Sequence, residues 1–117
     1  EPVITIDHSL PPTINDRDAT ARLTAAFDRA FGEGTVIDPG MFTGSEDVSW
    51  FAREAGVPLV FWFWGGLDPQ QYADALARGA VNEEIPTNHS PYFAPVLHPT
   101  IEHGVDALVV AAREFLA

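Results

Sequence analysis

The spacing of apolar residues predicts an amphipathic helix near the start of this 117-residue chain and another at its end. Between residues 15 and 31 apolar side chains recur every three or four positions, as they do on one face of a helix: Leu23, Ala26, Phe27, Ala30 and Phe31. Asn15 is the expected N-cap, and Gly32 ends the helix. Residues 100–116 show the same periodicity, so this last helix is expected to pack onto a sheet.

Two shorter helices are expected between these ends. Ser45 is the predicted cap of a helix that Gly56 closes, with the acidic Glu46 and Asp47 in the first turn, where they complement the positive end of the helix. Residues 68–77 begin with Asp68, a proline and a capping-box glutamine, which together indicate a third helix start.

Three β-rich runs predict strands, at residues 3–6, 35–38 and 57–64. The run 57–64 is apolar at every position after its proline, which suits a strand covered on both faces. Helices that alternate with strands indicate an α/β fold, a layered sheet with helices on both faces.

Composition and charge narrow the classes of partner. With 46% hydrophobic residues the chain can bury a core, and its length corresponds to one domain at most. Seventeen acidic residues against six basic ones, all arginine, give a net charge of −11. Nucleic acids and anionic membranes are therefore poor partners, because both require a cationic surface. The absence of cysteine excludes disulfides and thiolate ligands within this chain.

No apolar run approaches the roughly 20 residues that span a bilayer, so a cytoplasmic protein is expected. The chain begins without methionine, inside an expected strand, and we expect it to be part of a larger protein.

His89 is the main candidate for chemistry. It lies in the stretch IPTNHSPYF between Pro86 and Pro91, and the two prolines restrict the backbone on both sides of the imidazole. A loop this stiff can aim a metal ligand, but an ordinary surface turn has the same composition. His8 is expected on the surface, His98 in a capping or packing role, and His103 in solvent.

The residues alone do not complete a site. No His-x-Asp or His-x-x-x-His pair is present, and one imidazole cannot hold an ion that usually takes three or four protein ligands. There is no nucleophile elbow, P-loop or dinucleotide fingerprint. From the residues, the chain is an α/β domain with one well-positioned histidine.

Three stretches in order, PPTIND, GSEDVSWF and NHSPYF, are similar to the C-terminal part of the aminoacylase-like zinc metallopeptidases. This family of amidohydrolases includes the hippurate hydrolases and the N-acyl-amino-acid amidohydrolases. The similarity extends over nearly the whole chain, with an aromatic run and Gly65-Gly66 between the second and third stretches.

The resemblance implies that His89 is the last metal ligand, with zinc as the expected ion and manganese, cobalt or nickel as alternatives. It also implies that Gly44, Ser45 and Glu46 line the substrate cleft, where N–H groups at a helix start could receive a substrate carboxylate. Simple helix capping is the other interpretation of these three residues. No catalytic residue is expected in this chain, because the family's other ligands and its general base have no counterpart in these 117 residues.

The resemblance divides the chain into residues 1–12, the end of a lid or dimerisation domain, and residues 13–117, the C-terminal portion of a catalytic domain. The implied partners are a small N-acyl amino acid or amide substrate and the remainder of the catalytic domain, and self-association through exposed apolar faces is also expected. On its own the chain is expected to be inactive. Two alternatives stay open: a stand-alone, non-enzymatic α/β interaction module, and an acidic protein that docks a basic target.

Overall fold

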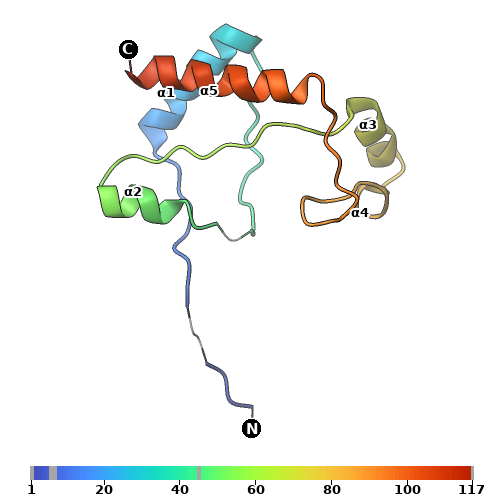
Figure 1. Ribbon diagram of the computed structural model, residues 1–117, viewed down its shortest axis with the longest axis horizontal. Helices are drawn as coiled ribbons and strands as arrows, with labels where there is room; N and C mark the ends of the chain where they lie inside the picture. Colours follow the sequence, from blue (N-terminus) through green and yellow to red (C-terminus); the bar gives the residue numbers. More distant parts are fainter. Residues whose placement is uncertain (1, 6–7, 45, 117) are drawn as a thin grey trace. The chain divides into compact units, whose positions relative to one another are not determined.

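The computed structural model describes residues 2–5, 8–44 and 46–116, and within these residues the regular structure is helical. Five helices follow one another along the chain (Figure 1): α1 Arg17–Phe31, α2 Ser49–Ala55, α3 Pro69–Ala77, α4 Val81–Glu84 and α5 Thr100–Leu116. The chain divides into two compact units. The first comprises residues 1–62 and 110–117, and the second comprises residues 63–109.

Helix α1 forms the core of the first unit. Asp16 is its N-cap and accepts a hydrogen bond from the backbone N–H of Ala19 at 2.8 Å, while Gly32 ends the helix at a φ of 103°. The buried side chains on its apolar face are Leu23, Ala26 and Phe27, which confirms most of the predicted stripe. The Phe27 ring meets the Trp62 ring edge-on, with 5.7 Å between the ring centroids.

The second unit has a small core around Ala75, Ile85 and Ala107, all of which are buried. Helix α3 begins as predicted, because the Asp68 carboxylate accepts the N–H of Gln71 at 2.8 Å. Gly104 in α5 leaves room for the Trp64 indole, whose nearest atoms lie 3.1 Å from where a Cβ would be. A larger residue at Gly104 would therefore push the indole away.

The predicted layered α/β sheet is wrong. Residues 3–5, 35–38 and 57–64 form no strand, and no other described residue belongs to one. A strand needs a row of bonds to a neighbouring strand, and the segment 57–64 is instead held by the Asn15 side chain and a single backbone bond from Asp16. The Asn15 amide donates to the carbonyl of Phe61 at 2.8 Å and accepts the Phe61 N–H at 2.7 Å. A third bond runs from the Asp16 N–H to the Leu59 carbonyl at 2.7 Å.

Two consequences of the missing sheet are visible in the exposure of apolar residues. The aromatic run was expected to be covered on both faces, yet Phe63 and Trp64 are 65% and 51% exposed. The α5 face expected to pack onto the sheet is also largely open, with Leu108 and Leu116 at 55% and 85% exposure.

Two further differences concern helix starts, and a third is the short helix α4, which the sequence did not predict. Asn15 was the predicted N-cap of the first helix, but Asp16 takes that role while Asn15 binds Phe61. Helix α2 begins at Ser49 rather than next to Ser45, which lies outside the described residues. Its end was predicted correctly, since Gly56 adopts the left-handed conformation with φ 64° and ψ 36°.

Candidate functional site

His89 lies in a tight turn between α4 and α5, and its side chain is exposed. Two backbone bonds fix the turn: the Ser90 N–H donates to the Thr87 carbonyl at 2.9 Å, and the Phe93 N–H donates to the Ser90 carbonyl at 3.1 Å. The Ser90 hydroxyl accepts the Tyr92 N–H at 3.2 Å. Together with the flanking prolines, these bonds hold the backbone next to the imidazole in a defined conformation.

The imidazole of His89 is not committed to any structural contact. Among the residues that the structure describes, its side chain makes no hydrogen bond, ion pair or ring contact. Side chains that fix a turn by bonding to its backbone are usually those of Asn, Asp, Ser and Thr. The bonds that fix this turn come from Thr87, Ser90 and their neighbours, so the imidazole is free to bind another group.

The described residues do not form a complete metal site. They contain no group of three or more histidine, aspartate or glutamate side chains placed to hold an ion. Structural and catalytic zinc sites use three or four protein ligands. His89 can therefore supply one ligand, and this part of the chain does not fit a resident zinc ion by itself.

Some of the backbone N–H groups predicted to receive a substrate carboxylate already donate hydrogen bonds within the chain. The Glu46 carboxylate accepts the N–H of Asp47 at 2.9 Å and the N–H of Val48 at 3.4 Å. Gly44 is exposed, and a Cβ there would lie 2.7 Å from the Phe42 ring. Ser45 is not described. The role of Gly44, Ser45 and Glu46 in binding substrate stays a prediction.

The other histidines are separate from His89. His98, just before α5, has its Nδ1 2.5 Å from a carboxylate oxygen of Glu102 in the first turn of that helix. This hydrogen bond holds the pKa of Glu102 below its ordinary value. His8 and His103 are exposed, as expected.

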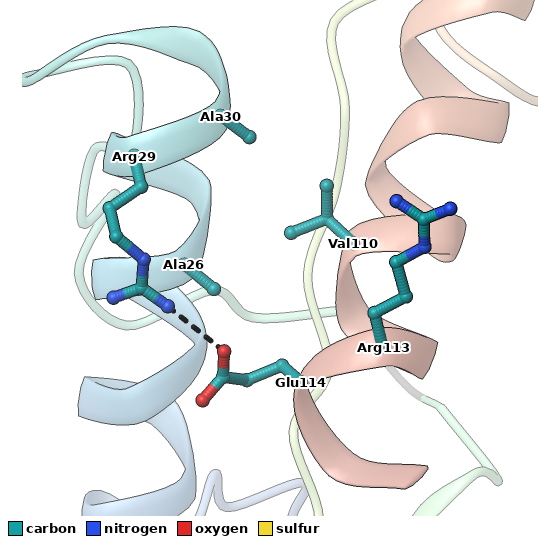
Figure 2. Close-up of a pocket in the computed structure, with 6 residues that line it drawn as sticks. All are labelled: Ala26, Arg29, Ala30, Val110, Arg113 and Glu114. Carbon is teal, nitrogen blue, oxygen red and sulfur yellow. Dashed lines mark hydrogen bonds and ion pairs between the residues drawn. The ribbon is translucent and has the colours of Figure 1, made fainter. Parts of the chain in front are cut away.

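A pairing that the sequence did not reveal joins α1 to the end of α5. Arg22 Nε donates to the Glu114 carboxylate at 2.7 Å, and Arg29 donates to its other oxygen at 2.9 Å. A second guanidinium nitrogen of Arg22 donates to the backbone carbonyl of Glu114. Figure 2 shows the Arg29–Glu114 bond at the edge of a shallow cavity of about 270 Å³. The bond from Arg22, aided by Arg29, lowers the pKa of Glu114.

No protein-family model matches the chain. Among the described residues, no helix is long and apolar enough to cross a membrane. The geometry of the His89 turn and the ordered motifs are therefore the grounds on which a function is proposed.

Proposed function

We propose that this chain supplies one metal ligand, His89, to a metal-dependent amidohydrolase that cleaves N-acyl amino acids or related amides. Zinc is the proposed ion, with manganese, cobalt or nickel as alternatives. The other ligands and the general base belong to polypeptide outside these 117 residues, and the enzyme works in the cytoplasm. The chain on its own binds metal weakly and hydrolyses nothing.

One observation carries this proposal. His89 is exposed between two prolines, and its turn is fixed by bonds that leave the imidazole unused by the other described residues. A ligand from a loop needs this combination, because zinc–nitrogen bonds are held near 2.0–2.1 Å and a mobile side chain would lose entropy on binding. The ordered PPTIND, GSEDVSWF and NHSPYF stretches supply the reaction class.

The test uses the full-length protein that carries this chain. His89→Ala is expected to lower zinc affinity by more than about 100-fold, since even supporting residues of a metal site contribute 10–100-fold. Metal content after dialysis and turnover of an N-acyl amino acid are the two measurements. His8→Ala is the matched control, because His8 is also exposed and makes no hydrogen bond, ion pair or ring contact with another described residue.

Loss of both metal and turnover in His89→Ala, but not in His8→Ala, is the expected outcome. Full metal occupancy and turnover in His89→Ala would contradict the proposed hydrolase function. Amide hydrolysis by the 117-residue chain alone would contradict the statement that the rest of the site lies elsewhere.

A stand-alone interaction module is the second candidate function, and one observation favours it. In the second unit the apolar face of α5 is exposed at Ile101, Val105 and Leu108. A contiguous apolar surface of this kind commonly marks an interaction site. If the module is correct, Leu108→Glu abolishes association of the chain in sedimentation velocity, and His89→Ala leaves that association unchanged.

A further inference from the structure

The arginines of this acidic chain fall into two groups. Ion pairs join three of them to carboxylates: Arg22 and Arg29 to Glu114, and Arg78 to Glu84. The other three, Arg17, Arg53 and Arg113, pair with no carboxylate among the described residues. With 17 acidic residues against six arginines, an unneutralised guanidinium is unexpected. Arg17 and Arg53 also line one and the same cavity.

This cavity is shallow and open to solvent, lies within the first unit, and has a volume of about 590 Å³. Its walls are the residues that enter α1, one side of α2, and the segment that follows α2. The apolar part of the lining comes from Pro12, Ile14, Ala52, Val57 and Leu59. A cavity with an apolar lining and a few charged groups is the usual form of a site for an amphiphilic molecule.

The walls of the cavity are joined to each other by hydrogen bonds. The Asp16 N–H donates to the Leu59 carbonyl at 2.7 Å, which ties the start of α1 to the segment after α2. Ser49 is buried, with 3% of its surface exposed, and its hydroxyl donates to the Pro11 carbonyl at 3.3 Å. These contacts hold the cavity open before any ligand arrives, so less ordering is required on binding.

The charge lining the cavity is positive. Asp16 is the acidic residue in the lining, and one of its carboxylate oxygens already accepts the Ala19 N–H at 2.8 Å. Arg17 and Arg53 line the same cavity as this single carboxylate. The guanidinium of Arg53 lies 5.6 Å from the centre of the Trp50 ring, a contact that orients its charge without neutralising it.

We propose that this cavity binds a small organic carboxylate with an apolar body. The carboxylate pairs with Arg17 and Arg53, because a guanidinium is matched in geometry to carboxylate oxygens. The apolar body packs against the proline and aliphatic side chains of the lining. This site requires neither His89 nor a metal ion. The outcome of its test is therefore independent of the proposed hydrolase function.

The test is a titration of the 117-residue chain with phenylacetate, followed by the backbone amide signals in heteronuclear NMR. Saturable shifts are expected at Ala52, Val57 and their neighbours. Phenylacetamide has the same shape without the charge, and it is expected to bind at least about fivefold more weakly. Arg17→Gln and Arg53→Gln are each expected to weaken phenylacetate binding at least about fivefold.

Arg113→Gln is the matched control, because Arg113 is also unpaired among the described residues but does not line this cavity. It removes the same charge, so a general electrostatic effect would weaken binding equally in all three variants. Arg53→Lys keeps the charge and is expected to retain part of the affinity. The proposal is overturned if the amide binds as tightly as the acid, if the control weakens binding as much as the other two variants, or if no saturable shift occurs.

Discussion

Glu114 joins the end of α5 to two arginines of α1. Its two carboxylate oxygens accept bonds from Arg22 and Arg29, and its backbone carbonyl accepts another from Arg22. Arg22 also stacks on the Phe115 ring, with 4.8 Å from the guanidinium carbon to the ring centre. Surface ion pairs alone stabilise weakly, so what distinguishes this group is that two arginines share one carboxylate.

Stability is expected to fall in acid because of Glu114. Its pKa is lowered from the ordinary value of 4.5, chiefly by the hydrogen bond from Arg22. A carboxyl with a depressed pKa stabilises the folded chain above its unfolded pKa, and this contribution disappears as the pH falls through the folded pKa. In Glu114→Gln this part of the pH dependence should be absent.

The measurement is urea unfolding at a series of pH values from about 6 down to about 3, a range that brackets an ordinary glutamate pKa. Glu54→Gln is the control, because Glu54 is exposed and pairs with no cation among the described residues. The same slope of stability against pH in the wild type and in Glu114→Gln would contradict the assigned role.

For single residues, the sequence indicated the candidate metal ligand but not the ion pairs. His89 could be singled out because its prolines are neighbours in the chain. Arg22 and Glu114 are separated by 92 positions, and no local pattern indicates that they meet. The cavity lined by Arg17 and Arg53 was missed for the same reason, since its walls come from separate segments.

Helices were predicted well because their signals are local. The caps at Asp68 and Gly56 and the end of α1 at Gly32 depend on residues within one turn. The start of α2 was missed because the Glu46 carboxylate occupies the N–H groups of Asp47 and Val48 before the helix begins. Strands could not be predicted reliably, because a β-rich run becomes a strand only when another segment pairs with it.

Asn15 is expected to stabilise the first unit by fixing the segment around Phe61. Its amide both donates to and accepts from the Phe61 backbone, so Asn15→Ala removes two hydrogen bonds. Because the pair is exposed, we expect a loss of about 1–2 kcal/mol in the free energy of unfolding. Faster hydrogen exchange at the Phe61 amide is the local measurement.

Asn82→Ala is the control for this substitution. Asn82 is exposed on α4, and its side chain makes no hydrogen bond to another described residue. The alanine variant should unfold at the wild-type denaturant concentration or slightly above it, since alanine favours helix. An equal loss of stability in both variants would contradict a specific role for Asn15.

The net charge of the chain and its exposed apolar side chains have opposite effects on self-association. A net charge of −11 keeps copies of the chain apart, while large apolar side chains such as Met41, Leu108 and Leu116 are exposed. Salt screens the repulsion and leaves the apolar attraction intact. We therefore expect the isolated chain to be monomeric at low ionic strength and to associate as salt is added.

Sedimentation velocity at about 0.01 M and about 1 M salt measures this effect, because the screening length falls from about 30 Å to about 3 Å between these concentrations. Leu108→Glu should reduce association at the higher concentration. Met41→Glu introduces the same charge outside α5, so it shows whether the exposed face of α5 is responsible for the association. Association that weakens as salt rises would contradict an association driven by apolar contacts. It would instead favour binding through opposite charges.

The bonds around Asn15 also determine how the chain ages chemically. Deamidation begins when the backbone nitrogen of the next residue attacks the asparagine side-chain carbonyl, closing a succinimide and releasing ammonia. Here that nitrogen belongs to Asp16 and is held by the Leu59 carbonyl, while the Asn15 side chain is held by Phe61. The reaction must wait for this region to open. The rate at which stored protein gains a carboxylate at Asn15 is therefore a covalent record of how often the segment detaches.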